Sequence, residues 1–179
     1  PDVLSGNCNI EGNVRYETPL DKAKSWKFTT QSRISFRNSR DYLNTSGSAA
    51  PSVNSVGRLL ASERFDVNWH RKLYSVNFTA NLTLNHSESA RFQTLNAIDY
   101  DYGVRGQMPL PAGFEAYAEM RMYSRAGYSD DNYNTNQLIA NIKLAKSLFK
   151  GKIRAELEVF DLFDKMSGYS YFINAQMQQ

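Results

Sequence analysis

The chain has 179 residues, which suits one or two domains, with 41% hydrophobic and 13% aromatic residues. Its formal net charge of +3 comes from basic residues that stand singly at alternate positions, so a nucleic-acid partner is not expected. The single cysteine, Cys8, excludes an internal disulfide and a cysteine-rich metal site, and no apolar run approaches the roughly 20 residues of a membrane-spanning helix.

The first predicted strand covers residues 8–18. It follows the segment PDVLSGN, which lacks the basic-then-apolar pattern of a signal peptide, so we expect a processed chain or a piece of a longer protein. Alternate residues of the strand form an apolar face: Cys8, Ile10, Gly12, Val14 and Tyr16. This position predicts that Cys8 is a buried, unreactive thiol.

The second predicted strand, residues 25–42, shows the clearest pattern in the chain. Between Trp26 and Phe36, apolar or neutral side chains alternate with polar or charged ones without exception. Successive side chains of a strand point to opposite faces of the sheet. One face is therefore apolar and the other polar.

The same alternation predicts six more long strands, at residues 58–70, 73–87, 94–108, 113–126, 135–148 and 152–162, and a ninth that begins near Tyr169. A helical period fails wherever the two-residue period succeeds. At 11–18 residues, these strands exceed the usual 5–6 and suit tilted membrane strands. Two charged residues, Glu63 and Lys146, fall on the apolar face. Lys146 lies near a turn, where its amine can reach the interface, and Glu63 can stand above the bilayer.

The predicted connections alternate in length. Tight turns occur at 20–24, 71–72, 110–113 and 150–151, and longer loops at 44–57, 86–93, 128–134 and 165–168. In an antiparallel meander alternate connections share one end of the sheet. Outer-membrane barrels have this asymmetry, with short periplasmic turns and longer extracellular loops.

Aromatic residues cluster towards both ends of the apolar face, as in the girdles of membrane barrels: Tyr16, Trp26, Trp69, Tyr74 and Phe114 near the tight turns, and Phe36, Tyr100, Tyr102 and Tyr128 near the loops. We predict an all-β, antiparallel up-and-down meander of about eight or nine long strands that is part of a transmembrane β-barrel. The alternative is a soluble, lipocalin-like eight-stranded barrel that encloses a small apolar ligand. The dense charges of the polar face favour a hydrated lumen.

Motifs in the second half of the chain resemble a known family. They are Ser124–Tyr128, Asn136–Asn141, Lys146–Gly151, Phe160–Asp164 and Ser170–Gln176. In this order and spacing they resemble the C-terminal barrel region of TonB-dependent receptor-like outer-membrane proteins common in Bacteroidetes. The resemblance covers about residues 95–179, and the earlier strands share only the general character of the family's strands, without its motifs. Asp164 departs from the family pattern, which usually has Asn there.

The resemblance implies a whole protein with a barrel of roughly 22 strands, a signal peptide and an N-terminal plug. Residues 1–179 would then be a single β-barrel segment, a fragment without the signal peptide, the plug and the final strand. Such a segment has two open edges, so pairing of edge strands between copies of the isolated fragment is possible.

The sequence predicts no enzyme. His70 lies beside a tight turn and His86 at the far end of the next strand, about 50 Å away at ~3.4 Å per residue. They cannot form one catalytic dyad or one zinc site. The acidic pairs Asp99/Asp101, Glu115/Glu119 and Glu156/Glu158 stand at strand period on the polar face, where we expect Arg105, Arg121 and Arg154 to balance them. Asp130 and Asp131 form a loop tip, for which solvation is a simpler role than cation binding.

We therefore expect no catalytic, cofactor-binding or metal-binding residues and no cofactor. The leading hypothesis is a segment of a receptor or transport barrel in the bacterial outer membrane, in contact with membrane lipid. Loops 43–57 and 127–134 would face outside and bind an extracellular nutrient ligand. The sequence identifies neither this ligand nor the residues that bind it. A third hypothesis is a structural module that assembles through its open edges.

Overall fold

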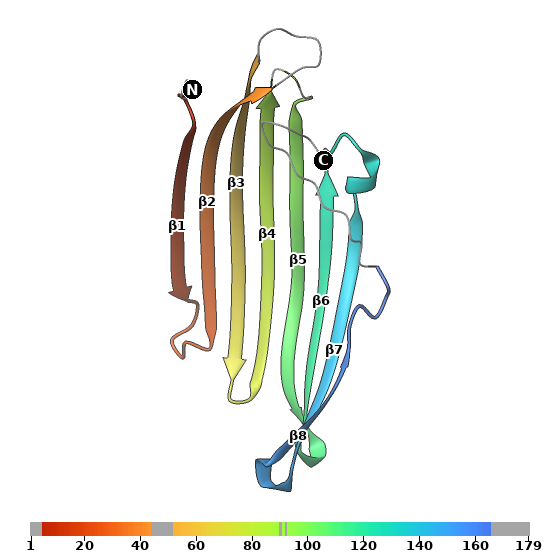
Figure 1. Ribbon diagram of the computed structural model, residues 1–179. Coiled ribbons are helices and arrows are strands. Elements are labelled where there is room, and N and C mark those ends of the chain that lie inside the picture. Colours follow the sequence, from red (N-terminus) through yellow and green to blue (C-terminus); the bar gives the residue numbers. More distant parts are fainter. Residues whose placement is uncertain (1–4, 44–51, 90, 92, 166–179) are drawn as a thin grey trace.

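The computed structural model describes residues 5–43, 52–89, 91 and 93–165. The described residues form one antiparallel sheet in which each strand pairs with the next along the chain (Figure 1). Its strands are β1 (Cys8–Pro19), β2 (Trp26–Leu43), β3 (Ser52–Arg71), β4 (Tyr74–Ser89), β5 (Leu95–Leu110), β6 (Phe114–Ala126), β7 (Asn136–Leu148) and β8 (Ile153–Val159). The prediction of an all-β up-and-down meander of long strands is confirmed.

Most strand ends lie within two residues of their predicted positions. The largest difference is β3, which begins at Ser52, six residues before the predicted start at Arg58. Its first residues read SVNSVG, small and turn-prone, but residues 38–43 of β2 supply pairing partners as far as Ser52. β8 ends at Val159 instead of residue 162, and the strand predicted near Tyr169 lies outside the described residues.

The connections alternate in length as predicted. The turns β1–β2, β3–β4, β5–β6 and β7–β8 lie at one end of the sheet, here called the turn end, and the other connections lie at the opposite, loop end (Figure 1). The β3–β4 turn has only two residues, Lys72 and Leu73. Lys72 takes a positive φ of 54°, which lets so short a connection reverse the chain. Short 3-10 turns at Pro111–Gly113 and Phe149–Gly151 make two of the other reversals.

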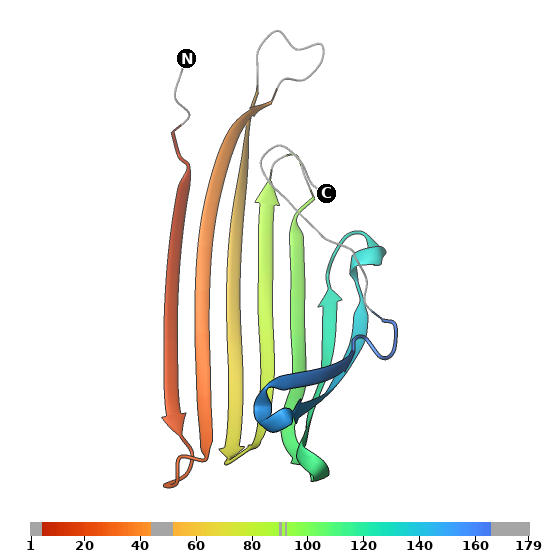
Figure 2. The same ribbon diagram turned by 60° about the horizontal axis from the view of Figure 1, so that its bottom comes forward.

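The sheet is strongly curved but open, because β1 and β8 are not paired with each other in the described part of the chain. The last strand, β8, turns across the front of the sheet (Figure 2). Asn68 of β3 and Glu158 of β8, from strands that are not neighbours, line one cavity, which makes this face concave. Gly103 of β5 permits a close approach within the curve, since a Cβ there would lie 2.6 Å from the Met120 carbonyl oxygen.

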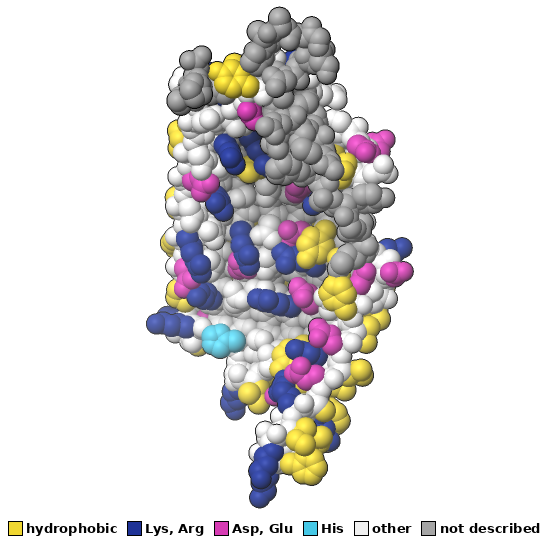
Figure 3. Space-filling model, viewed as in Figure 1, with side chains coloured by type: hydrophobic (Ala, Val, Ile, Leu, Met, Phe, Trp, Pro, Cys, Tyr) yellow, Lys and Arg dark blue, Asp and Glu magenta, His cyan; other side chains and the backbone are white. Residues whose placement is uncertain are grey.

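The concave face is the polar one. Figure 3 looks onto it and shows Lys, Arg, Asp and Glu side chains across the middle of the sheet, with most apolar side chains at the margins. The convex face carries the apolar side chains, which are exposed: Val14 is 68% exposed and Leu157 67%. These apolar side chains therefore lie on the outside of the curve and do not fill its interior. Cys8 lies on the convex side and is exposed, so the prediction of a buried thiol is wrong.

The two charged exceptions on the convex face both have local partners. The Glu63 carboxylate accepts a hydrogen bond from the Thr30 hydroxyl, and Ser32 is its neighbour across the strand pair. The Lys146 ammonium lies 4.3 Å from the centre of the Phe114 ring, a cation–π contact. Separately, no helix among the described residues has the length and apolar character needed to cross a membrane.

Candidate functional site

The polar face of the sheet is held in its middle by a network of charges. The Arg64 guanidinium donates to Asp66 at 2.6 Å, and the Thr79 hydroxyl donates to the same carboxylate at 2.8 Å. Across β5 and β6, Arg121 forms an ion pair with Asp101, which also accepts from the Asn81 amide at 2.9 Å. These carboxylates are partly buried and hydrogen-bonded, which offsets the cost of removing them from water.

A second network bridges β6 and β8 across β7. Arg154 donates to Glu115 at 2.9 Å and to Glu156 at 2.7 Å, and the Tyr117 hydroxyl donates to Glu115 at 2.9 Å. Ala145 stands between the two acidic residues in the register and is 1% exposed. A small residue on β7 thus permits the arginine to join strands that are not neighbours. The predicted balancing roles of Arg121 and Arg154 are confirmed.

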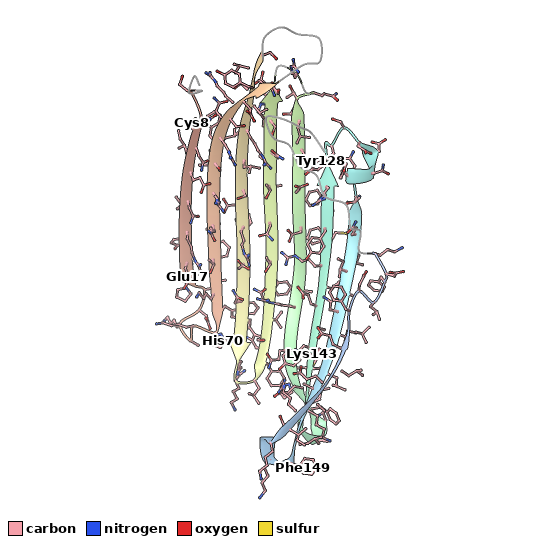
Figure 4. The ribbon with its side chains drawn as sticks, in the orientation of Figure 1. Cys8, Glu17, His70, Tyr128, Lys143 and Phe149 are labelled. Atoms are coloured by element: carbon pink, nitrogen blue, oxygen red, sulfur yellow. The ribbon has the colours of Figure 1, made fainter. Side chains whose placement is uncertain are left out.

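At the loop end the described residues form their hydrophobic core cluster, made of Leu95, Ala97 and Tyr128 with Tyr133 packed against it. The Tyr128 hydroxyl donates to both oxygens of Asp99 at 3.0 and 2.9 Å. Burial, together with this hydrogen bond, raises the pKa of Tyr128 to about 12. Figure 4 shows Tyr128 near the loop end of the sheet. The prediction that Tyr128 belongs to an aromatic girdle on the apolar face is wrong, since Tyr128 packs over Ala97 on the polar side.

The loop that follows β6 is fastened to the same cluster. The Asn134 side chain accepts from the Tyr128 backbone N–H at 3.0 Å and donates to its carbonyl oxygen at 2.9 Å. Gly127 takes a φ of +85°, and a Cβ there would lie 2.1 Å from the Asn96 carbonyl oxygen. Only glycine fits this position. The base of the loop predicted to bind ligand is therefore packed against β5.

The other residues considered in the sequence stay apart. His70 and His86 lie at opposite ends of the β3–β4 hairpin, and the His86 ring contacts Asn96 at 2.6 Å. Asp130 uses its carboxylate to accept the backbone N–H of Asn132 at 2.9 Å, closing a turn. The described residues contain no group of three or more His, Cys, Asp or Glu placed to hold a metal ion.

The turn end of the concave face contains a cavity of about 570 Å³, here called the turn-end cavity. Two adjacent rows of side chains, one residue from each strand, cross its floor. The register places Asn68, Asn77, Arg105, Glu119 and Asn141 in the first row, and His70, Ser75, Gln107, Tyr117, Lys143 and Glu158 in the second. Figure 4 shows His70 and Lys143 at this end of the sheet.

Several polar groups in this cavity are not engaged with the rest of the protein. Within the described ranges, the side chains of Arg105, Gln107 and Glu119 have no hydrogen bond or ion pair, and the same holds for His70, Ser75 and Glu158. Arg105 and Glu119 are direct neighbours across β5 and β6 but do not form an ion pair. Arg105 thus lies beside an acidic residue, as predicted, but forms no ion pair with it, and no feature of the alternation distinguishes it from Arg121.

Comparison of the chain with models of protein families, with curated proteins and with solved structures gave no match.

Proposed function

We propose that this chain is a segment of the wall of a receptor or transport barrel in a bacterial outer membrane. The observation that supports this proposal is the inversion of the sheet, with exposed apolar side chains on its convex face and hydrogen-bonded charges on its concave face. Lipid can cover an apolar outer surface and water can fill a polar lumen, which is the arrangement of transmembrane β-barrels. The loops at one end would meet an extracellular ligand.

Strand length and surface shape also support the proposal. β2 and β3 have 18 and 20 residues, more than the roughly 9–11 that a tilted strand needs to cross a bilayer. Trp26 and Trp69 lie on the convex face near the turn end, with ring centres 6.1 Å apart. Indole rings prefer the membrane interface. β1 and β8 each present one edge without a strand partner in the described part of the chain, where further wall strands can add.

The soluble barrel with an apolar interior is not proposed, because no observation favours it. A lipocalin-like ligand site requires apolar side chains on the concave face, and here that face carries the charge networks. Pairing of the open edges between copies of this chain stays a prediction.

A pair of single-cysteine variants tests the proposal. In a Cys8→Ser background, Ala80→Cys places a thiol on the convex face and Thr83→Cys places one on the concave face of the same strand, β4. Each protein is refolded into vesicles and labelled with an environment-sensitive dye. We expect lipid-borne nitroxides to quench the dye at position 80, and water-soluble iodide to quench the dye at position 83.

The two tryptophans provide a check without labels. Lipids brominated near the headgroup should quench Trp26 and Trp69 more strongly than lipids brominated at the chain end. Equal access of iodide to positions 80 and 83, or failure of the folded chain to enter vesicles or micelles, would contradict the proposal.

A further inference from the structure

Two oppositely charged register neighbours in the turn-end cavity do not form an ion pair, unlike the charged pairs found elsewhere on the concave face. In the middle of the sheet Arg121 and Asp101 pair, and at the first hairpin Arg33 and Glu11 pair at 3.0 Å. In the cavity Arg105 and Glu119 are register partners yet neither has a hydrogen bond or ion pair to any described residue. Their donors and acceptors are therefore available to a bound molecule.

The cavity also has a suitable size and shape. Its volume of about 570 Å³ lies within the range of roughly 300–1,000 Å³ found for small-molecule sites. Side chains from β3 to β8 line it, including Glu158 of β8, and β8 crosses in front of the sheet (Figure 2). Arg154 holds β8 in this position through its bond to Glu115 of β6 at 2.9 Å. The strands that line the cavity are thus held together by a side-chain bond between β6 and β8.

The charges of the cavity indicate the class of ligand. Arg105 and Lys143 are opposed by Glu119 and Glu158, so the formal charge of the lining sums to zero. Neighbouring partners across a strand pair have Cβ atoms about 4.5–5.5 Å apart. An ionic group bound to Arg105 would therefore lie close to the carboxylate of Glu119, and a cation bound to Glu119 would lie close to the guanidinium. Neither sign of ligand charge is favoured.

A hydroxyl group suits such a pair, because it can accept from a guanidinium and donate to a carboxylate at the same time. Of the other unengaged groups, Gln107, His70 and Ser75 each both donate and accept hydrogen bonds, and the Glu158 carboxylate accepts them. We propose that the turn-end cavity binds a neutral, hydroxyl-rich molecule such as a short oligosaccharide. Arg105 and Glu119 bind the same ligand hydroxyls, and Gln107 binds the next.

This site goes beyond the proposed function, because it lies at the opposite end of the sheet from the loops expected to meet the extracellular ligand. It does not depend on which solvent covers the convex face. The two proposals therefore fail separately: the labelling experiment concerns β4 and lipid, and binding in the cavity is measured in detergent micelles with the whole 179-residue chain.

Isothermal titration calorimetry with three trisaccharides of similar size provides the test: neutral maltotriose, an acidic trimer of galacturonic acid and a basic trimer of glucosamine. We expect maltotriose to bind with a millimolar or lower Kd and both charged trimers to bind at least 10-fold more weakly. Arg105→Met and Glu119→Gln should each weaken maltotriose binding by about 10-fold or more, since each removes a charge-assisted hydrogen bond.

Arg33→Met is the matched control, because it removes an arginine from the same face outside the cavity. It should leave binding unchanged. Gln107→Leu gives an uncharged second variant, and circular dichroism confirms that each protein keeps its sheet. Absence of maltotriose binding to the folded chain would overturn the proposal. So would tighter binding of either charged trimer, or an equal loss of binding in the Arg33→Met control.

Discussion

The two ends of the concave face are built on the same alternation of residues but are occupied differently. At the loop end Leu95 is 1% exposed, and Tyr128 fills the surface above it with its hydroxyl bound to Asp99. At the turn end Arg105 and Glu119 stand side by side without a bond to the described residues. The loop end is thus a packed structural element, and the turn end keeps polar groups available. The alternation of residues determines which face of the sheet a side chain lies on, but it does not determine whether that side chain forms a hydrogen bond or an ion pair.

Two glycine substitutions, one at each end, should show the largest difference in the free energy of unfolding. Gly127→Ala at the loop end introduces a Cβ at a positive φ, 2.1 Å from a backbone oxygen that cannot rotate away, and should lower the free energy of unfolding by at least about 3 kcal/mol. Gly113→Ala at the turn end has a φ of +74° but open space around its Cβ, so it should cost only about 1 kcal/mol.

Urea denaturation of both variants in micelles measures this difference. Similar losses at the two positions would show that the loop end is no more tightly packed than the turn end.

A pH titration sharpens the same comparison. Burial raises the pKa of Tyr128 from its usual value of 10.0 to about 12, so the folded state holds the phenol proton more strongly than the unfolded state does. The stabilisation is complete below pH 10 and is lost as the pH rises from 10 to 12. At roughly 1.4 kcal/mol per pKa unit, the loss amounts to at most about 3 kcal/mol.

Denaturation midpoints of the natural chain and of Tyr128→Phe, measured across this range, isolate the contribution of Tyr128 from those of the other tyrosines. The natural chain should lose more stability than the variant between pH 10 and 12. Parallel curves would contradict the buried, hydrogen-bonded state of this tyrosine.

The architecture is predictable from the sequence, because strands such as Trp26–Leu43 alternate polar and apolar residues with a two-residue period. The start of β3 is not predictable in this way, because its residues have weak strand propensity and the length of β2 decides the pairing. The face of Tyr128 is also not predictable from the alternation. The positive φ of Gly127 redirects the chain after β6, so Tyr128 no longer follows the alternation of β6. The alternation places Arg105 and Arg121 on the same polar face, so it contains no signal for which of the two forms an ion pair.

A smaller effect is expected when one hydroxyl is removed at each end. Tyr128→Phe leaves the Asp99 carboxylate without its shortest hydrogen bonds and should cost about 1–2 kcal/mol near neutral pH. Tyr117→Phe at the turn end removes the bonds to Glu115 and Arg154, but these two groups keep their own ion pair at 2.9 Å and are partly exposed. It should cost less than about 0.5 kcal/mol. Equal costs would mean that the two ends are equally well packed.

The smallest effect on stability is the most informative about the turn-end cavity. Arg105→Met removes a guanidinium that has no described partner, so the free energy of unfolding should change by less than about 0.5 kcal/mol. Arg121 lies on the same face, on the neighbouring strand β6. Arg121→Met deprives the partly buried Asp101 of its ion pair and should cost about 1–3 kcal/mol. A residue that contributes nothing to stability but is required for binding of a neutral trisaccharide is retained for its ligand. If Arg105→Met destabilises the fold as much as Arg121→Met does, then Arg105 belongs to the structural network and the cavity is not a binding site.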